Sequence, residues 1–222
     1  MHSNLEIARE RLIAHYGRRA RPAAPNSFAA LIDALLDDAG DSSRAAQVLE
    51  NMSTADVVDI RTLSDASFDE LSEWLAPVGN AQKRGERLRR LAAFVVDRYD
   101  GDIDAMLAAD AETLREELLG IRGIGAETAD SVLLFAAGRP SFVVDLAAHR
   151  MLKRHGWVEF DADNATVKEY VESGLARDPA RLAEFHDLLQ IVGRRHCRKA
   201  PVCEGCPLAE LLPEGGPLTP EF

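Results

Sequence analysis

Cysteine is scarce in this chain of 222 residues, and its three cysteines all lie between positions 197 and 206. An odd, clustered set of thiols argues against a disulfide framework and favours a metal site. Long apolar runs are also missing, because none reaches the roughly 18 residues that a membrane span needs. Residues 1–11 are polar and charged, without the apolar stretch of a signal peptide. We therefore expect a cytoplasmic protein that does not contact a membrane.

Basic residues are outnumbered, since 26 Lys and Arg face 37 Asp and Glu and give a formal net charge of −11. This total argues against a nucleic-acid partner, because Lys and Arg drive phosphate binding. Acids are concentrated in segments 33–41, 56–73 and 102–117, and bases in segments 83–90, 150–155 and 194–199. An uneven surface of this kind can present one basic face despite the acidic total. Ordinary solvated helix faces are the simpler explanation.

Hydrophobic residues make up 46% of the chain, which is enough for a substantial core. Apolar residues recur at three-and-four spacing, and no strand-like alternation persists, so we expect an all-α fold. The expected helices are Ser27–Leu36, Ser43–Met52, Ser67–Ala76, Ala81–Tyr99, Ile103–Ala108, Ala111–Leu118, Ala126–Ala137, Leu146–His155, Thr166–Gly174 and Ala180–Arg195.

The connections between these helices are short, and no internal repeat, low-complexity segment or flexible linker interrupts them. We therefore expect one unit, residues 1–222, made of two tightly packed helical lobes. One lobe would comprise about residues 25–137, and the other the N-terminal segment with about residues 138–207. A loop rich in Pro and Gly, with the cysteines in segment 197–215, would follow the last long helix.

The segment 118–130, LLGIRGIGAETAD, places a turn between two expected helices. Gly123 and Gly125 flank Ile124, and glycine permits the positive φ angles and close backbone approach of a tight turn. The helix that begins near Ala126 directs free N–H groups outward, and such an end can hold an anion such as a DNA phosphate. Ile124 would fix the turn to the core. A plain helix–helix turn with a glycine cap explains the same residues.

A Gly/Pro loop follows this hairpin and leads through the apolar run Phe142–Val144 to Asp145. A carboxylate at that point can lie on the wall of a cleft beside apolar neighbours. A helix N-cap is the alternative role for Asp145. The helix that follows carries bases that could reach a nucleic-acid backbone, namely Arg150, Lys153 and Arg154.

The pattern G-I-G-x-E-T-A-D-S-V-L-L-F at 123–135, followed by a Gly/Pro loop and F-V-V-D, resembles the helix-hairpin-helix–GPD superfamily of DNA glycosylases, typified by endonuclease III. Its E-T-A-D form is most similar to the 3-methyladenine DNA glycosylase III branch and its endonuclease III-related members. The similarity extends from Phe28 to about Pro207. Within it, segment 75–84 resembles the turn and basic helix before the hairpin, and segment 186–197 resembles the entry to an iron-sulfur loop.

The resemblance implies two helical lobes around a cleft, and a monomer that binds double-stranded DNA containing a damaged base. The base would be flipped into a pocket between the lobes. Asp145 would stabilise the positive sugar that develops as the N-glycosidic bond breaks, and would orient the attacking water. Such a protein would work in base excision repair at the nucleoid. The residues expected to contact DNA are Lys83, Arg84, Gly123, Ile124, Gly125, Thr128 and Arg150.

Bifunctional members of the family carry a lysine in the second hairpin helix, which attacks the sugar and leads to strand cleavage. The corresponding residue here is Glu127, which cannot form a Schiff base. The sequence therefore predicts a monofunctional glycosylase without lyase activity by that route, acting on alkylated or otherwise damaged bases.

Departures from the family pattern include the turn after the first helix and the cysteine loop. Relatives follow the first Leu-Leu helix with a Gln- and Thr-rich turn that contacts DNA, whereas this chain has Asp37, Asp38 and Asp41 there. These carboxylates would repel phosphates and weaken binding. The family's iron-sulfur cluster takes four cysteines spaced C-x6-C-x2-C-x5-C, but Cys197, Cys203 and Cys206 supply three, and the fourth position is Leu212.

The three thiolates could hold an incomplete or externally completed [4Fe-4S]-type cluster or a zinc ion, or could be relics of a lost site. The cofactor is therefore left open. Two alternatives to the alkylated-base glycosylase remain as well. One is a pyrimidine- or mismatch-directed glycosylase on the same fold, and the other is a catalytically degenerate DNA-binding or scaffold protein.

Overall fold

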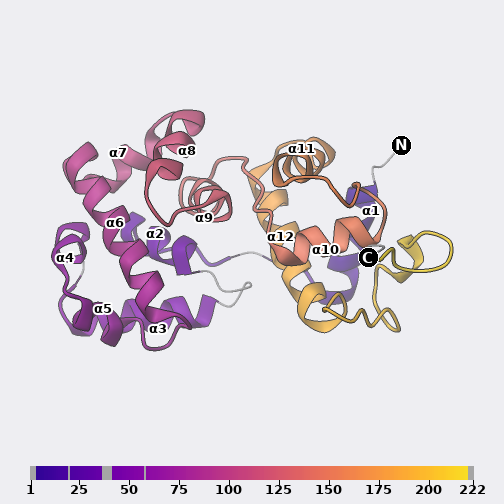
Figure 1. Ribbon diagram of the computed structural model, residues 1–222, viewed down its shortest axis with the longest axis horizontal. Helices are drawn as coiled ribbons and strands as arrows, with labels where there is room; N and C mark the ends of the chain where they lie inside the picture. The colour runs from indigo at the N-terminus through magenta and orange to yellow at the C-terminus, as the bar shows by residue number, and fades with distance from the viewer. Residues whose placement is uncertain (1–3, 20, 37–41, 58, 220–222) are drawn as a thin grey trace. The chain divides into compact units, whose positions relative to one another are not determined.

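The computed structural model describes residues 4–19, 21–36, 42–57 and 59–219. Within these ranges every regular element is a helix, and no strand is present, which confirms the all-α prediction (Figure 1). No helix in this described part combines the length with the apolar character that crossing a bilayer takes. The helices in chain order are α1 Asn4–Tyr16, α2 Ser27–Leu36, α3 Ser42–Thr54, α4 Ile60–Asp65, α5 Phe68–Trp74, α6 Ala81–Tyr99, α7 Ile103–Ala108, α8 Ala111–Gly120, α9 Ala126–Ser131, the π-helix η1 Val132–Ala136, α10 Leu146–Arg154, α11 Asn164–Gly174, α12 Pro179–Arg195 and the 3-10 helix η2 Ala209–Leu211.

The chain divides into two compact units. Unit 1 comprises Met1–Arg21 with Pro140–Phe222, and unit 2 comprises Pro22–Arg139. Unit 1 contains α1, α10, α11 and α12 together with the cysteine loop, and unit 2 contains α2 to α9 and η1. The expectation that two tightly packed lobes form one glycosylase unit stays a prediction.

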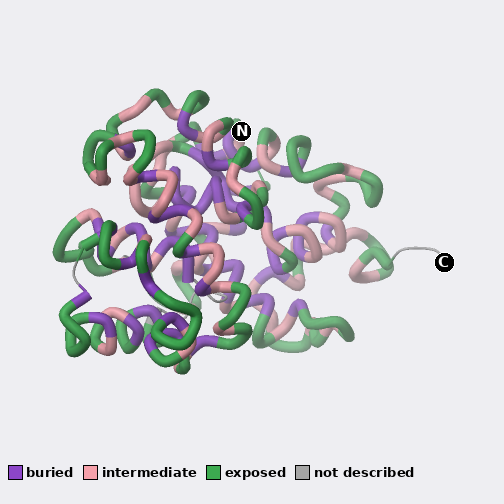
Figure 2. The backbone as a smooth tube through the Cα atoms, turned by 60° about the vertical axis from the view of Figure 1, so that its left-hand side comes forward, coloured by how far each residue is buried: buried purple, intermediate pink, exposed green. Residues whose placement is uncertain are grey.

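Unit 2 is built around the apolar faces of α2 and α6. Helix α2 buries nearly its whole surface, and α6 buries Leu88, Leu91 and Val95, which recur at the spacing of one helix face. Helices α4 and α5 pack on α6, and η1 packs on α2. Burying this much apolar side chain is the main term that stabilises the unit, at roughly 25 cal/mol per Å². In Figure 2 the buried stretches follow the inner sides of the helices.

Unit 1 is built on α12, against which α10 and α1 pack. Helix α12 carries fully buried Leu182, Phe185 and Leu188. The sequence predicted no helix over Asn4–Tyr16, and α1 shows why: only the short stripe of Leu5, Ala8 and Leu12 is buried. Such a narrow stripe in a charged segment gives little periodic signal.

Most predicted boundaries agree with the helices, and α2, α6 and α7 match their predicted bounds. Helix α5 begins with the predicted cap, in which Ser67 and Glu70 form a capping box. Two differences stand out. Helix α4, capped by Asp59, was not predicted, and the predicted helix Ala126–Ala137 changes at Val132 into a π-helix. The Ala137 N–H donates to Val132 O at 2.9 Å, five residues back, which widens the last turn.

Candidate functional site

The hairpin turn, residues 121–125, joins α8 to α9. Gly123 has φ +95°, a backbone conformation that favours glycine, and Ile124 N–H donates to Ile121 O at 3.0 Å to close the turn. The Ile124 side chain is 5% exposed and belongs to the core of unit 2, which confirms that it fixes the turn. A DNA contact by Ile124, as predicted, would therefore use its backbone.

Gly125 differs from Gly123. Its backbone is extended, with φ −99° and ψ −179°, so the expectation that a positive φ explains glycine in this turn is wrong at position 125. A Cβ built on Gly125 meets no atom within 4 Å. Nothing in the free protein requires glycine here, and the open space leaves room for the backbone of another molecule to approach.

An ion pair clamps the two helices of the hairpin together. Asp130, the last residue of the E-T-A-D motif, is 3% exposed, and Arg115 Nε of α8 donates to its Oδ1 at 2.8 Å. A buried carboxylate is tolerated only where it is paired and hydrogen-bonded. Asp130 therefore holds the angle between α8 and α9, and this part of the motif has a structural reason.

Helix α6 supports the hairpin through arginines at three-residue spacing. Arg87 Nη1 donates to Thr128 Oγ1 at 3.2 Å, and Arg90 Nη1 donates to Arg122 O at 3.0 Å. Both arginines lie in the basic segment 83–90, but their contacts with the turn were not predicted. The signal was available, because residues three apart share one face of a helix. Burial and the nearby Arg84 lower the pKa of Arg87, and Glu127 opposes that shift.

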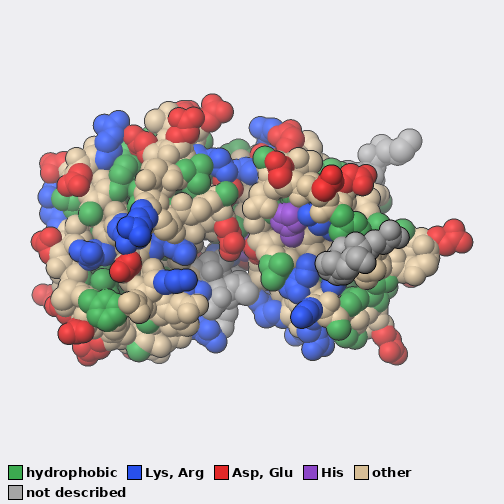
Figure 3. All heavy atoms as spheres, in the orientation of Figure 1, with side chains coloured by type: hydrophobic (Ala, Val, Ile, Leu, Met, Phe, Trp, Pro, Cys, Tyr) green, Lys and Arg blue, Asp and Glu red, His purple; other side chains and the backbone are tan. Residues whose placement is uncertain are grey.

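The predicted DNA contacts on α6 have different surroundings. Lys83 is exposed, whereas Arg84 Nη1 donates to Leu36 O at 3.1 Å and so caps the end of α2. In Figure 3 several Lys and Arg side chains gather in the middle of the visible face of unit 2, while most of its Asp and Glu side chains lie nearer the margin. This uneven distribution agrees with the segregation of charge along the sequence.

Asp145 begins α10 in unit 1. Its backbone is extended, and its Oδ1 accepts the Ala148 N–H at 2.8 Å, so Asp145 is an N-cap. The side chain is only 10% exposed. The other carboxylate oxygen, Oδ2, lies 3.2 Å from His186 Nε2 of α12. Capping and a chemical role do not exclude each other here, because each oxygen has a different partner.

A row of ionisable side chains extends from Asp145. The second ring nitrogen of His186, Nδ1, lies 3.4 Å from Asp187 Oδ1. Asp187 in turn accepts from Arg21, with Nη2 at 2.6 Å from Oδ1 and Nε at 3.1 Å from Oδ2. The His186 side chain is 4% exposed. The four groups, which we call the Asp145 charge row, are Asp145, His186, Asp187 and Arg21.

Burial by itself would raise the pKa of the Asp145 carboxyl. The hydrogen bond and positive charge of His186, with the backbone N–H groups of Ala148 and Ala147, outweigh it and hold that pKa below its ordinary value. For Asp187, burial is likewise outweighed by His186 and Arg21, so its pKa is also lowered. Both carboxylates are therefore ionised at neutral pH although they are largely withdrawn from water.

The chain that leads to Asp145 is fixed by a buried glutamate. Phe142 is fully buried, and its N–H donates to Glu172 Oε1 of α11 at 2.8 Å. Lys168 Nζ lies 3.8 Å from the same oxygen and donates to Ser141 Oγ at 2.6 Å. The centroid of the Phe142 ring lies 6.3 Å from that of Phe185 and 6.4 Å from that of His186. Apolar packing and one charged anchor thus set where Asp145 lies.

The bases after Asp145 are mostly engaged within the protein. Arg154 Nη1 lies 3.3 Å from Cys197 Sγ and donates to Arg198 O at 2.6 Å, while Lys153 donates to Phe160 O. Arg150 Nε donates to Leu146 O at 3.2 Å on an exposed part of α10. Arg150, Lys153 and Arg154 are all partly exposed, and the contact of Arg150 with DNA stays a prediction.

The three cysteines and Leu212 line one small apolar cavity at the end of α12. Cys197 is buried, and burial together with the neighbouring Cys203 and Cys197 raises the pKa of the Cys206 thiol. Across the described residues, no group of three or more His, Cys, Asp or Glu side chains is placed to hold a metal ion. These residues do not fit a four-thiolate cluster. Metal binding by Cys197, Cys203 and Cys206 stays a prediction.

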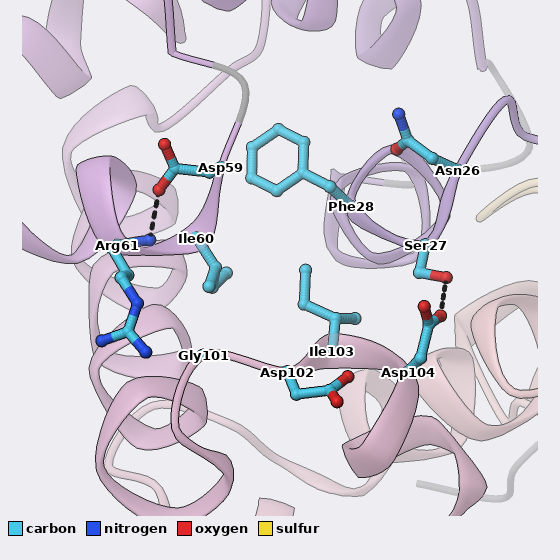
Figure 4. Close-up of a pocket in the computed structure, with 10 residues that line it drawn as sticks. All are labelled: Asn26, Ser27, Phe28, Asp59, Ile60, Arg61, Gly101, Asp102, Ile103 and Asp104. Atoms are coloured by element: carbon cyan, nitrogen blue, oxygen red, sulfur yellow. Dashed lines mark hydrogen bonds between the residues drawn. The ribbon is translucent and has the colours of Figure 1, made fainter.

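A wider cavity of about 540 Å³ lies in unit 2 between α2, α4 and α7 (Figure 4). It shares no residue with the hairpin turn. Phe28, Ile60 and Ile103 supply apolar side chains to its lining, which also contains Arg61 and three carboxylates. Those carboxylates are Asp59, Asp102 and Asp104, and this excess of negative charge makes the cavity unsuitable for a phosphate.

Residues expected from the sequence thus fall into two groups. In unit 2, Arg84, Gly123 to Gly125 and Thr128 surround the hairpin and its supporting helix. In unit 1, Asp145, Arg150 and the cysteines lie on or beside α10 and α12. Glu127 is exposed on the first turn of α9. The acidic segment with Asp37, Asp38 and Asp41 lies outside the described residues.

Known proteins share both the sequence pattern and the fold. "Putative DNA repair glycosylase MJ1434" of Methanocaldococcus jannaschii is 32% identical over 201 residues, which are 90% of this chain and 91% of that protein. A structure of endonuclease III trapped as a covalent intermediate with DNA superposes with a TM-score of 0.74 at 22% identity, covering 97% of each chain. The Helicobacter pylori 3-methyladenine DNA glycosylase bound to 1,N6-ethenoadenine gives a TM-score of 0.69 at 23% identity, covering 86% of this chain and 97% of that one.

The family model described as "HhH-GPD superfamily base excision DNA repair protein" matches residues 34–177. That range includes the hairpin, Glu127 and Asp145. The chain therefore belongs to the HhH-GPD superfamily of base excision DNA repair glycosylases, with the endonuclease III-like fold.

Proposed function

We propose that this protein is a monofunctional DNA N-glycosylase that removes damaged, alkylated bases from double-stranded DNA. One observation carries the proposal: Asp145 presents a carboxylate that is largely buried yet held ionised, at the position where the family resemblance expects the catalytic aspartate. A carboxylate in that state can stabilise a developing positive charge more strongly than one in water.

In the proposed reaction the damaged base leaves the duplex stack and enters the enzyme. The bond between C1′ of the sugar and the base nitrogen breaks, and the base departs with the electron pair. The Asp145 carboxylate stabilises the positive charge left on the sugar. Water then attacks C1′ and releases one proton to the solvent, so that the products are the free base and an abasic site.

Glu127 supports the absence of lyase activity. It lies on the first turn of α9, where the resemblance expects the lysine of bifunctional members. A carboxylate has no amine with which to form a Schiff base, so the strand would stay intact after the base is removed.

The hairpin supports DNA binding by backbone contacts. Gly123 and Gly125 are exposed, and the space around Gly125 is open. Arg87 and Arg90 of α6 donate hydrogen bonds to Thr128 and to the Arg122 carbonyl, so the amide groups of the turn are held in place before DNA binds. Contacts of this kind recognise phosphates and carry no information on base sequence. The protein is proposed to act as a monomer.

An exposed aliphatic side chain next to the carboxylate supports an alkylated base as substrate. Leu146 directly follows Asp145 and is 68% exposed, so its apolar surface is available to a ligand. An alkylated base carries positive charge and added apolar surface, so a carboxylate beside an aliphatic group suits it. The Helicobacter pylori relative, named for 3-methyladenine, shares this fold.

The test incubates the protein with duplexes that each carry one lesion: 3-methyladenine, 7-methylguanine, uracil or an oxidised pyrimidine. Strand breaks are read with and without hot alkali. Breaks at alkylated bases that need alkali are the expected result. Breaks without alkali would overturn the monofunctional assignment, and excision of uracil or oxidised pyrimidine alone would favour the pyrimidine-directed alternative.

Binding measured at two salt concentrations separates the remaining alternative. A catalytically degenerate DNA-binding protein would excise nothing but would lose affinity steeply with added salt. Absence of binding at low salt would contradict every DNA-directed function considered for this chain.

A further inference from the structure

The Asp145 charge row lies wholly in unit 1, but its members are far apart in sequence. Arg21 precedes Asp187 by 166 residues, and the two are joined by three hydrogen bonds. His186 lies between Asp187 and Asp145 with both ring nitrogens facing carboxylates. The four charges, two negative and two positive when the imidazole is protonated, sum to zero.

This balance matters because the row is withdrawn from water. Two carboxylates near one another destabilise each other's ionised form, and burial adds to that cost. A protonated imidazole donates from both nitrogens, one bond to each carboxylate, whereas the neutral ring donates only one. Groups beside His186 include Asp145 and Asp187, with Arg21 behind Asp187. The Gln190 amide lies 3.4 Å from Nε2, and the uncharged Phe142 ring packs against the imidazole.

The row also fixes the direction of the Asp145 carboxylate. One oxygen accepts the Ala148 N–H and the other faces the imidazole, so rotation about the side chain would break one contact or the other. The imidazole is itself held by Asp187, and Asp187 by the Arg21 guanidinium. Removing an outer member would therefore loosen the inner ones without touching Asp145.

We propose that His186, held by Asp187 and Arg21, is the positioning residue of Asp145: it fixes the direction in which the carboxylate faces the reacting sugar. This inference rests on the proposed function of Asp145 as the catalytic carboxylate. His186 is too deeply buried to contact DNA, so it acts through Asp145 and is not itself catalytic.

The main test compares His186→Gln with His155→Gln. His155 is a second buried histidine of unit 1, and its nitrogens face the backbone carbonyls of Met151 and Leu208 rather than carboxylates. His186→Gln should lower kcat on an alkylated duplex by about 10- to 100-fold, the cost of a misplaced reacting group, and leave KM within about twofold. His155→Gln should leave both constants within about twofold of the wild type, which controls for the loss of a buried imidazole.

A titration of the Asp145 carboxyl by carbon NMR of ¹³C-aspartate-labelled protein needs no substrate. The pKa of Asp145 should rise in His186→Gln and stay unchanged in His155→Gln. A folded His186→Gln protein with an unchanged Asp145 pKa and wild-type kcat would overturn the inference. If the wild-type protein excises no lesion, the proposed function fails, but the titration still decides whether His186 controls Asp145.

A second variant covers the case in which His186→Gln does not fold. Arg21→Gln removes the outermost charge of the row, on a side chain that is 17% exposed. It should raise the Asp145 pKa and lower kcat about threefold to tenfold, with KM unchanged and partial restoration by Arg21→Lys. Wild-type values of kcat and of the Asp145 pKa in Arg21→Gln would then overturn the inference.

Discussion

Asp145 and Cys206 are two acidic groups of unit 1 that respond to burial in opposite ways. Burial is the largest single influence on both groups, and acting alone it would raise the pKa of each. Asp145 nevertheless has a lowered pKa, because His186 and the first N–H groups of α10 stabilise its charge. Cys206 has a raised pKa, because its neighbours Cys203 and Cys197 add like charge to an apolar cavity. Partners rather than depth therefore decide whether a buried acid is ionised.

The largest effect should come from removing the charge of Asp145. Asp145→Asn retains an N-cap, since Asn caps helices as well as Asp does. We expect excision to fall on the order of 10³-fold, because the group that stabilises the sugar cation is neutral. Single-turnover excision assays measure it.

The control for this prediction is Asp163→Asn. Asp163 caps α11 in the same way, accepting the Thr166 N–H at 2.8 Å, but is exposed and has no buried row of charges beside it. It should excise at the wild-type rate. Excision at the wild-type rate by both variants would mean that Asp145 acts only as a cap.

The raised pKa of Cys206 is tested by measuring thiol reactivity. Because the thiolate is the reactive form, the raised pKa of Cys206 predicts that iodoacetamide modifies it about tenfold more slowly in the folded protein than in urea at pH 8. Mass spectrometry of peptides reports each cysteine. A chelator should not change the rate. Faster modification after chelation would show that a metal had protected the thiols and would contradict the poor fit of this site to a cluster.

In the turn 121–125, backbone conformation rather than charge determines the effect of a substitution. Gly123→Ala should lower the free energy of unfolding by roughly 1–2 kcal/mol, because φ +95° strains a residue with a Cβ. Gly125→Ala should leave that free energy unchanged but weaken DNA binding, since the added methyl occupies open space beside the turn.

Urea unfolding and fluorescence anisotropy separate these two effects. Wild-type affinity in a stable Gly125→Ala protein would mean that the turn joins two helices and does nothing more.

The smallest effects should appear in the pH dependence of stability. Asp145 should contribute stability that is lost in acid, and Cys206 stability that is lost in alkali. The lowered pKa of Asp145 gives stability that is present above the unfolded value, about 3.9, and is lost as pH falls through the folded value. The raised pKa of Cys206 gives stability that is present below the unfolded value, about 8.5, and is lost as pH rises through the folded value.

Urea midpoints against pH should therefore fall less steeply in acid for Asp145→Asn and less steeply in alkali for Cys206→Ala. A variant that changed the slope at the wrong end would contradict the assigned shift.

Much of this molecule could be predicted from its sequence, because the relevant signals are local. The periodicity of α2 and α6, the capping box at Ser67 and the hairpin around Ile124 each occupy one short segment. Asp145 was found as the acid that ends an apolar run, and both of its proposed roles, cap and carboxylate near a cleft, were open. The structure shows that it is a cap with a buried ionic partner.

The remainder depends on contacts between distant segments. Nothing in the sequence pairs Arg21 with Asp187. His186 was predicted only to begin the segment that resembles the entry to an iron-sulfur loop. Arg154 was expected to reach toward nucleic acid, but it binds the carbonyls of the cysteine loop, because a guanidinium can serve either purpose. The sequence predicted the same need for glycine at positions 123 and 125, because it does not distinguish a positive φ from a position that needs only open space.

The discontinuity of unit 1 has a consequence for synthesis on the ribosome. Unit 2 is one uninterrupted stretch, Pro22–Arg139, and can fold as soon as it emerges. Unit 1 begins with Met1–Arg21 but must wait for α12, more than a hundred residues later, before α1 and Arg21 find their partners. A nascent or prematurely terminated chain would thus display a finished hairpin before it had a supported Asp145, so that the proposed DNA-binding turn would form before the proposed catalytic carboxylate is held in place.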